Sequence, residues 1–424
     1  MLCPRCAAPL VTIASAEPWC SVCEWNLLRF DPVRHRDGLG WAWLDRRLYA
    51  MTFAASETRY RSLRSRPLHR RASPARMATI VATAALLGGV LALAITGGWL
   101  VARHISSPVT VMGALLIAIA VGLGPRFGRL APMTVDAGRV SSDEAPRLFA
   151  LIGRVAAAIG APLPHVVLVG ETFDVSVTTV GLRRRRVLRL GAPLWATLGR
   201  QERVALLGHE LGKFIAGDLR QGLFTRSAED AIAKVVYLFT PVRGLTEATK
   251  SPATGVFMSA LADVLVTTIG GTLARLVYLL SLTLARVAGV DSQRAAYFAD
   301  ELAAAAAGTP GAVGLLDHLL LHDSIDTVVC REARARKDAA AWRVAAVTAY
   351  ENTTPTLPLH RQLSRRRDTS PLFPAPPLGL RARMLMHRPA RPARVALLES
   401  EAESIDAELA SYYERARTHL AHKV

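Results

Sequence analysis

The chain contains little cysteine and little charge for its length. Five cysteines in 424 residues exclude a small disulfide-rich domain, in which cysteine is far denser. Charged residues make up 20% of the chain and apolar residues 51%. This balance excludes a disordered or fibrous chain and indicates membrane segments.

Lysine is also scarce, although the chain is strongly basic. Lysine and arginine number 52 against 34 acidic residues, which gives a formal net charge of +18. Only five of the 52 are lysines, so 47 are arginines. Such an excess predicts an anionic partner, which could be a phospholipid surface, nucleic acid or an acidic protein. Composition alone does not choose among these three.

Four of the five cysteines form two CxxC pairs near the N-terminus, Cys3 with Cys6 and Cys20 with Cys23. Each CxxC turn can aim two thiolates at one point, and the spacer can return the second pair to the first. Four thiolates in tetrahedral array select Zn²⁺ in a closed, structural site. We therefore predict a zinc ribbon over residues 1–28 that depends on its metal for folding.

Two disulfides, or two redox-active pairs, are the alternative interpretation of these cysteines. The paired spacing and the lack of a preceding signal peptide favour zinc and a reducing compartment. The pattern does not say whether the ribbon stabilises the chain or contacts protein or nucleic acid.

Two long uncharged runs follow a basic connector, residues 29–76, in which we expect one juxtamembrane helix. Residues 77–102 are uncharged over 26 positions, and residues 105–124 over 20. A bilayer core about 30 Å thick needs about 20 apolar helical residues. The sequence therefore predicts a transmembrane helical hairpin over residues 77–124.

Arginines at both outer ends of this hairpin predict its orientation. Six arginines lie between positions 61 and 76, Arg126 and Arg129 follow the second run, and the connection holds only Arg103. The positive-inside rule then places both termini in the cytoplasm, at the cell (inner) membrane. Anionic headgroups of the lipid bilayer are the expected partner. Nucleic acid remains possible for the 61–76 cluster, but the neighbouring span favours lipid.

The pattern of residues 130–424 is that of a globular, mainly helical domain with a small sheet. We expect, in order, a helix over 145–159, a strand over 165–170, a hairpin of 175–180 with 187–190, and a helix over 195–218. Arg183–Arg186 lie in the turn of that hairpin.

The last of these helices carries G-H-E-L-G-K at residues 208–213. In H-E-x-x-H, two histidines one turn apart bind Zn²⁺, and the glutamate polarises the metal-bound water. His209 and Glu210 occupy the first two positions, but Lys213 stands at the second histidine position. An ammonium group has no lone pair to offer a metal at neutral pH.

The order of these features resembles the HtpX-like membrane zinc metallopeptidases, relatives of the CAAX prenyl proteases. The resemblance covers roughly residues 77–424 and includes the uncharged hairpin, the strand pair and the motif helix. It also includes D-S-Q-R-A-A-Y-F-A-D at 291–300, which is similar to the family's S-x-x-x-E-[FY]-x-A-D. The family's fold and zinc chemistry are what this resemblance implies.

The resemblance implies a damaged catalytic site. The family's third zinc ligand, a glutamate, corresponds to Ala296, whereas Asp300 matches. A Thr-His-Pro segment before a final arginine-containing helix is matched by Thr369-Ser370-Pro371, with Arg381 and Arg383 beyond. The family's Asn-Ala-Phe edge-strand segment has no clear match, although Phe173-Asp174-Val175 stands near its place.

Two of the three ligand positions are therefore substituted, and a catalytic zinc needs three protein ligands. We predict that His209 is a remnant ligand, that Glu210 is a remnant catalytic residue paired with Lys213 or an arginine, and that catalytic Zn²⁺ does not bind. The function predicted is a membrane-anchored, inactive metallopeptidase homologue that acts as a binding or regulatory scaffold for an unidentified protein or peptide.

Two further functions remain open. One is an active zinc endopeptidase of membrane protein quality control that uses replacement ligands, for which His318 and His322 offer suitable spacing on a helix expected over 312–323. The other is a membrane-tethered zinc-ribbon adaptor. Residues 254–290 are apolar but contain charges, so a further span stays open there. We expect mostly loop over 355–377 and one helix over 399–422.

Overall fold

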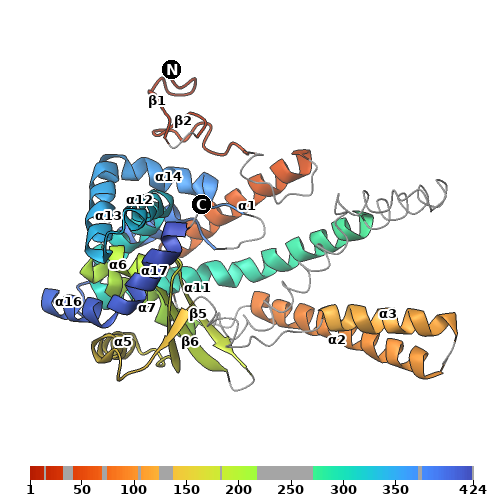
Figure 1. The fold of residues 1–424 in the computed structure, drawn as a ribbon. Helices are drawn as coiled ribbons and strands as arrows, with labels where there is room; N and C mark the ends of the chain where they lie inside the picture. The colour runs from red at the N-terminus through yellow and green to blue at the C-terminus, as the bar shows by residue number, and fades with distance from the viewer. Residues whose placement is uncertain are drawn as a thin grey trace, which may run out of the picture.

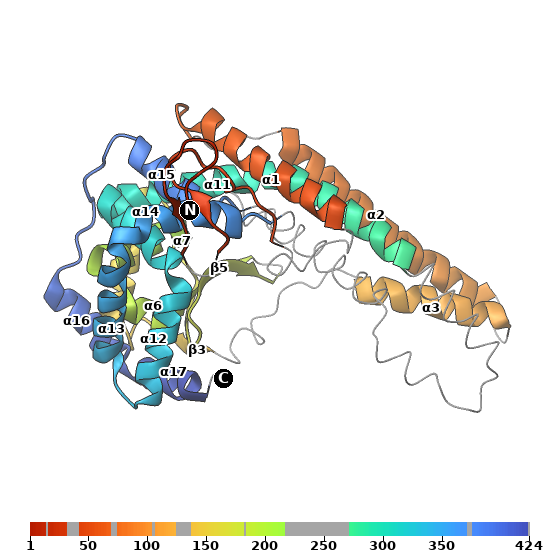
Figure 2. The ribbon, with the colours of Figure 1, turned by 90° about the horizontal axis from the view of Figure 1, so that it is seen from above.

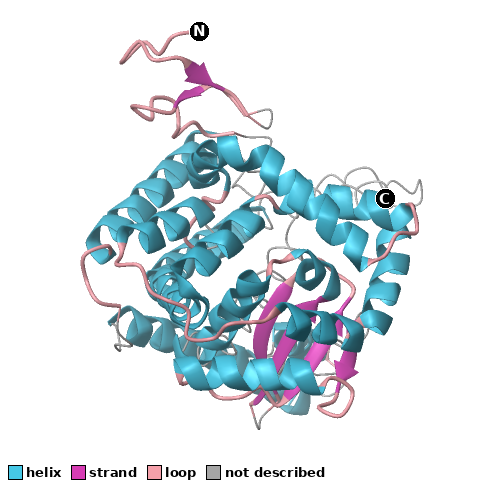
Figure 3. Ribbon diagram, turned by 90° about the vertical axis from the view of Figure 1, so that its left-hand side faces the viewer, coloured by secondary structure: helices cyan, strands magenta, loops and turns pink. Residues whose placement is uncertain are grey.

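The computed structural model describes residues 1–13, 16–31, 42–68, 74–103, 107–123, 137–181, 184–216, 271–370 and 375–422. Helices dominate, and one small sheet lies on one side of the helical body (Figure 1, Figure 3). The mainly helical fold class with a small sheet is thereby confirmed.

The N-terminal segment forms a small antiparallel ribbon, β1 (Leu10–Val11) with β2 (Trp19–Cys20). Helix α1 (Ala42–Leu63) follows, where the sequence predicts the juxtamembrane helix. Tyr60 of α1 packs in a buried cluster with Tyr297, Leu380 and Met384 of the helical body. Helix α1 is thus attached to the helical body.

The two uncharged runs form α2 (Pro74–Arg103) and α3 (Pro108–Leu123), which pack against each other and project from the body (Figure 1, Figure 2). Gly97 and Gly113 face each other at this contact. A Cβ on either would lie 2.8 Å from the carbonyl oxygen of the other. Glycine is therefore required for the two backbones to come this close.

The membrane-spanning part of this prediction remains a prediction. Within the described residues, no single helix combines the length and apolarity needed to cross a membrane. The bent pair Ser292–Leu320 and His322–Arg334, which turns by 72°, meets that criterion on length and composition alone. The apolar stretches found in α2 and α3, Gly88–Arg103 and Val109–Ala118, are shorter.

The sheet has four strands in the order β3-β4-β6-β5, with β4 and β6 parallel and the other neighbours antiparallel. The strands are β3 (Ala137–Val140), β4 (Val166–Gly170), β5 (Val175–Val180) and β6 (Arg185–Gly191). The expected strand and hairpin are therefore present. Helix α5 (Pro146–Ile159), also expected, buries its apolar face in the main core with these strands.

The helix expected over 195–218 is two helices, α6 (Ala192–Thr197) and α7 (Arg200–Ala216). Leu198 is extended, with φ −74° and ψ 140°, and the Gly199 N–H donates to Glu202 Oε2 at 2.9 Å. This contact is half of a capping box, in which a glutamate in the first turn of a helix accepts from the backbone N–H of the residue before the helix. It marks the start of α7. Residues 217 and 218 lie outside the described residues.

Helix α11 (Gly271–Leu320) runs from the α2–α3 side into the core and is kinked at Gly308, where φ is +82°. The helix expected over 312–323 is present as far as Leu320, where α11 ends, and the chain then turns by 72° into α12 (His322–Arg334). Of the apolar stretch 254–290, residues 254–270 lie outside the described residues, and the remainder is helical.

The loop expected over 355–377 is wrong for residues 355–367, which are helical, and correct for 368–370 and 375–377. Residues 371–374 lie outside the described residues. After α13 (Ala339–Thr353), a 3-10 turn (Thr354–Thr356) leads into α14 (Leu357–Arg367). Pro355 and Pro358 occupy the first turns of these elements, where the missing N–H costs nothing. Three helices complete the chain: α15 (Leu378–His387), α16 (Glu399–Glu408) and α17 (Ala410–His422), so the expected final helix is divided at Leu409.

Candidate functional site: a four-cysteine cluster and a buried ion network

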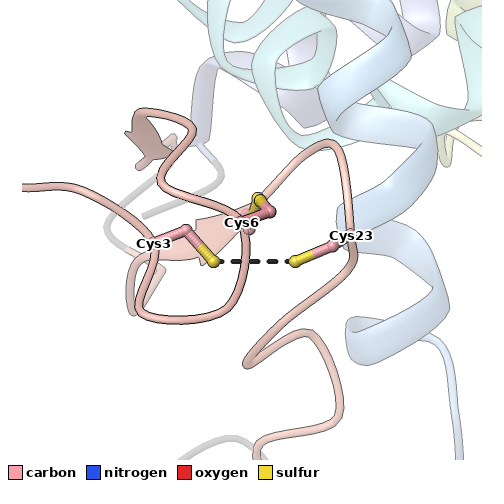
Figure 4. A group of neighbouring side chains, drawn as sticks. Cys3, Cys6 and Cys23 are labelled. Carbon is pink, nitrogen blue, oxygen red and sulfur yellow. Dashed lines mark hydrogen bonds between the residues drawn. The ribbon is translucent and has the colours of Figure 1, made fainter.

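The four N-terminal cysteines meet at one point, as their spacing predicts. Cys3 Sγ lies 3.6 Å from Cys23 Sγ (Figure 4). Cys6 Sγ lies 3.4 Å from Cys20 Sγ. All four sulfur atoms lie within 4.8 Å of one another, so they could hold a metal ion. The cysteines of the cluster are free thiols, which excludes the two disulfides in this structure.

The surroundings of the cluster act differently on its cysteines. A backbone hydrogen bond from Ala8 lowers the pKa of Cys6, but the neighbouring thiols raise it to about 12, and burial raises the pKa of Cys23. The residue after each second cysteine, Ala7 and Glu24, is left-handed with φ 57°, so the chain turns back sharply at both pairs. The backbone N–H groups of Cys23 and Val22 lower the pKa of the Cys20 thiol to about 6. The thiolate is the metal-binding form of cysteine.

The ribbon is docked on α14 through Trp19, which is fully buried. The indole N–H of Trp19 donates to Gln362 Oε1 at 3.1 Å, and Gln362 donates back to the Ser21 carbonyl at 2.9 Å. The Arg366 guanidinium donates to three ribbon carbonyls, those of Glu17, Asn26 and Leu27, and lies over the Trp19 ring. Arg366 of α14 thus satisfies three backbone acceptors of the ribbon.

The neighbouring arginine connects the ribbon to α1. Arg365 Nη2 donates to Glu24 Oε2 at 3.0 Å, and Arg365 Nε donates to Glu57 Oε1 at 2.6 Å. Arg365 and Glu57 are both buried, so both charges need these partners. Ribbon, α1 and α14 therefore form one connected unit.

The motif helix α7 lies against α11 because both carry small residues where they meet. A Cβ on Gly208 would lie 3.0 Å from the Ala303 Cα, and one on Gly212 would lie 3.1 Å from Leu302 Cδ1. This close approach sets His209 of α7 beside Asp300 of α11. The two motifs noted in the sequence, about ninety positions apart, are thereby brought to one site.

His209, Asp300 and Arg381 form a buried network at this site. His209 Nδ1 lies 2.9 Å from Asp300 Oδ1. Arg381, from α15, donates two hydrogen bonds to the Asp300 carboxylate at 2.7 and 2.9 Å. Its Nη2 also lies 3.2 and 3.3 Å from the two ring nitrogens of His209. The imidazole is therefore enclosed by a carboxylate and a guanidinium.

These contacts set the charges of the network. Burial lowers the pKa of His209, and the cations Arg381 and Lys213 lower it further, so the ring is neutral at pH 7. Burial alone would raise the pKa of Asp300, but the charge and hydrogen bonds of Arg381 hold it well below its usual range. The network is a buried ion pair with a neutral histidine against it.

Glu210 pairs with Lys213, as the sequence predicts. Lys213 Nζ lies 2.6 Å from Glu210 Oε1, and the glutamate side chain is buried. Glu210 Oε2 is buried without a hydrogen-bond partner among the described residues, and so is the hydroxyl of nearby Tyr297. The residue at the second histidine position thus neutralises the glutamate.

The residues around His209 do not fit a catalytic zinc ion. Asp300 is already bonded to Arg381, Glu210 is bonded to Lys213, and the third ligand position, Ala296, has no donor atom. Within the described ranges, the four cysteines form the one group of three or more candidate ligands that converge on a point. His209 remains a single nitrogen, whereas a catalytic zinc needs three protein ligands.

His318 and His322 do not form the alternative metal pair. The break at Leu321 places them on different helices, and each has another contact. His318 Nε2 lies 3.0 Å from Thr197 Oγ1 in the core, and the His322 ring packs edge-on against Phe173. Burial, followed by the charge of His322, lowers the pKa of His318 to about 4.

The buried His318 predicts a loss of stability in mild acid. The unfolded state binds a proton near pH 6.5, whereas the folded state does so only near pH 4. The free energy of unfolding should therefore fall by about 2–3 kcal/mol as the pH drops through this window. His318→Gln should flatten that decline in urea titrations, while His422→Gln, at the exposed end of α17, should not. Equal slopes in all three proteins would contradict this assignment.

Sequence reasoning missed most of the contacts that surround these sites. Arg381 was noted only as part of a matching helix, and nothing in the local pattern joins it to Asp300. The ribbon contacts of Gln362 and Arg366 lie more than 330 positions from their partners. The run Arg365–Arg367 could have indicated such contacts. A helix places three consecutive arginines on different faces, so at least one of them is directed toward a neighbouring segment.

No protein family, curated protein or solved structure matches this chain.

Proposed function

We propose that this protein is a membrane-anchored, metallopeptidase-like scaffold that binds a peptide or protein segment without cleaving it. One observation carries the proposal: Arg381 and Lys213 supply cations at the place where the motif would hold zinc. Each cation is paired with a carboxylate, Asp300 or Glu210. The ionic charges of the site are thus paired by protein groups, although Glu210 Oε2 is buried without a hydrogen-bond partner among the described residues.

The membrane anchor in this proposal is the α2–α3 hairpin. Its exposed side chains include large apolar ones, among them Leu91, Ile95, Trp99, Val111, Met112 and Val121, each more than half exposed. Apolar surface of this kind on a projecting hairpin favours lipid or another apolar partner. The uncharged sequence and the flanking arginines favour lipid.

The peptide-binding part of the proposal rests on β5. Among the described strands β5 pairs only with β6, so β5 is the edge strand at which we propose that a peptide adds as a further strand. Strand β5 also contacts α7, the helix that carries His209. Phe173, two residues before β5, is buried and packs against the His322 ring.

Zinc is the metal we propose for the cysteine cluster. A Zn–S bond of about 2.3 Å in a regular tetrahedron requires sulfur atoms about 3.8 Å apart. Two of the six sulfur–sulfur distances, 3.4 and 3.6 Å, are close to this value, and all six are within 4.8 Å. The docking of the ribbon on α14 supports a stabilising role within this chain.

Metal content and proteolysis together test the proposal. We expect one zinc per chain, lost in the Cys3→Ser, Cys6→Ser double variant and retained in His209→Ala. We also expect no cleavage of casein by the wild type at any added Zn²⁺, and the same result for Glu210→Gln. Stoichiometric zinc remaining in the cysteine variant, or casein cleavage abolished by Glu210→Gln, would overturn the inactive assignment.

A further inference from the structure

The four-cysteine cluster is built from two backbone turns of the same design. In the first turn the Ala7 N–H donates to the Cys3 carbonyl at 2.9 Å, and in the second the Glu24 N–H donates to the Cys20 carbonyl at 3.0 Å. Ala7 and Glu24 share the left-handed φ of 57°. The two turns are therefore equivalent, and each supplies a first and a second cysteine to the cluster.

The sulfur atoms of the cluster are in contact crosswise between these turns. Cys3 Sγ, from the first turn, has its 3.6 Å contact with Cys23 Sγ of the second (Figure 4). Cys6 Sγ has its 3.4 Å contact with Cys20 Sγ. Each contact thus joins the first cysteine of one turn to the second cysteine of the other. A covalent bond along each contact would hold the two turns together, as a bound metal does.

Each crosswise pair combines an accessible cysteine with a buried one. Cys6 is exposed and Cys23 is half-buried, whereas Cys3 and Cys20 are only 3% and 0% exposed. An oxidant from solution therefore reaches Cys6 first and Cys23 second. A thiol that meets the oxidant, beside a second thiol that resolves the product into a disulfide, is the arrangement of an oxidation-sensitive site.

The contacts that dock the ribbon on α14 are made by other groups. The indole N–H of Trp19 donates to Gln362, and Arg366 binds three backbone carbonyls of the ribbon. A change of bonding among the four sulfur atoms leaves these groups in place, provided that the two turns stay together. Crosswise bonds meet this condition, whereas a bond within each turn does not link the turns.

We propose that the cluster is a peroxide-sensitive site, at which the disulfides Cys6–Cys20 and Cys3–Cys23 replace the metal and keep the ribbon docked. This inference rests on the zinc proposed for the cluster. The oxidant is a hydroperoxide, of which hydrogen peroxide is the simplest. The ribbon then has two closed forms, a reduced form that holds zinc and an oxidised form that has released it.

The exchange balances over the four thiolates. The Cys6 thiolate attacks one peroxide oxygen, so that an S–O bond forms, the O–O bond breaks and hydroxide leaves. The Cys20 thiolate then attacks the Cys6 sulfur, so that an S–S bond forms, the S–O bond breaks and a second hydroxide leaves. Cys23 and Cys3 repeat both steps with a second peroxide. Four thiolates are oxidised, two peroxides are reduced, and Zn²⁺ leaves a site that has no thiolate ligand.

Disulfide mapping of the zinc-loaded full chain tests the pairing. The Cys330→Ser variant is used, so that the fifth thiol does not enter exchange, and it is treated with hydrogen peroxide, alkylated and unfolded. Trypsin cuts after Arg5 and chymotrypsin after Trp19, so digestion places Cys3, Cys6 and the segment 20–25 in three different peptides. Crosswise pairing links all three into one species, whereas pairing within each turn leaves the segment 20–25 with an internal bond.

We expect the single three-peptide species, and its fragmentation should assign Cys6 to Cys20 and Cys3 to Cys23. With about one equivalent of peroxide, the Cys6–Cys20 bond should exceed the other by about fivefold, because Cys6 is the more exposed thiol. Released zinc, measured with a colorimetric indicator, should reach one ion per chain at about two equivalents. A reductant together with added zinc should restore the starting metal content.

Hydrogen exchange tests whether the oxidised ribbon stays docked. In the oxidised, zinc-free protein, the amides of β1, β2 and the first turns of α14 should exchange within about twofold of their rates in the zinc form. The matched control is the reduced protein, stripped of zinc by a chelator in the presence of a reductant. Its ribbon amides should lose their protection, because neither metal nor disulfide joins the two turns.

The outcomes separate this inference from the zinc assignment on which it rests. A reduced protein that carries no zinc in the cluster would contradict the zinc assignment, and the exchange with it. Zinc that stays bound in excess peroxide, disulfides within each turn, or sulfinic acids in place of disulfides would leave the zinc assignment intact and overturn the exchange. Crosswise disulfides with unprotected ribbon amides would also overturn the proposal, since the ribbon would then open on oxidation.

Discussion

Replacing Asp300 with alanine is expected to lower the free energy of unfolding by about 3–5 kcal/mol, because the substitution leaves Arg381 buried without its carboxylate partner. Arg381 reaches Asp300 with two hydrogen bonds, and its side chain is only 12% exposed. Denaturation by urea, followed by far-UV circular dichroism, measures the change.

A double variant shows whether the loss of stability comes from the unpaired charge of Arg381 or from the missing Asp300 side chain itself. The double replacement Asp300→Ala with Arg381→Met removes both charges and should recover most of the loss. Asp338→Ala, which removes an exposed cap of α13, is the matched control and should cost about 1 kcal/mol. If the double variant is as unstable as Asp300→Ala, the ion pair is not the source of the effect.

The Asp300–Arg381 pair also determines how the free energy of unfolding changes in acid. A carboxyl whose pKa is lowered on folding contributes stability that is complete above the ordinary value of about 3.9. That contribution declines as the pH falls below this value toward the folded pKa of Asp300. The double variant should therefore lose less stability than the wild type between pH 4 and pH 2, on the order of 1 kcal/mol less.

Removing zinc is expected to unfold the ribbon while the α7–α11 core stays folded. Binding of a structural zinc provides about 10–16 kcal/mol, which a segment of some thirty residues cannot replace by burial. After chelation, the amides of β1 and β2 should lose all protection from hydrogen exchange. The first turns of α14 should also exchange faster, because Trp19 no longer packs against Gln362 and Leu363.

Cys330→Ser provides the control for the ribbon, since Cys330 is buried in α12 and lies outside the cluster. Cys330→Ser should leave unchanged both the zinc content and the protection of the ribbon amides from hydrogen exchange. Cys20→Ser should abolish the zinc content and this protection. Persistent protection of β1 and β2 in the chelated protein would show that burial of Trp19 and Leu27, without a metal, folds this segment.

Local patterns predicted the parts of this protein that local chemistry determines. The CxxC spacing confines four sulfur atoms to one point, and the alternating apolar residues of 175–180 form the strand that they indicate. The pairing of Glu210 with Lys213 was predictable for the same reason, because one helix turn separates them. Helix ends were less predictable, since Leu321 and Leu409 are apolar residues that no glycine or proline follows.

Contacts between distant segments were not predictable. Arg381 joins His209 across 172 positions, and Arg366 joins Leu27 across 339. An arginine in a single sequence carries no sign of its partner, because its long side chain can reach a carboxylate, a carbonyl or a ring. The prolines of 355–377 were misleading for another reason: Pro355 and Pro358 begin helical turns, where proline is favoured.

Because Arg366 of α14 binds three carbonyls of the ribbon, we expect the first thirty residues and this arginine to change together in evolution. A descendant that lost or exchanged the ribbon would keep the Arg366 guanidinium, buried in this structure, without its acceptors. One that lost Arg366 would leave three carbonyls of the ribbon unpaired. Either change alone lowers fitness before the other can compensate. Among relatives of this chain, the CxxC pairs and an arginine at this position of α14 should therefore be gained and lost together.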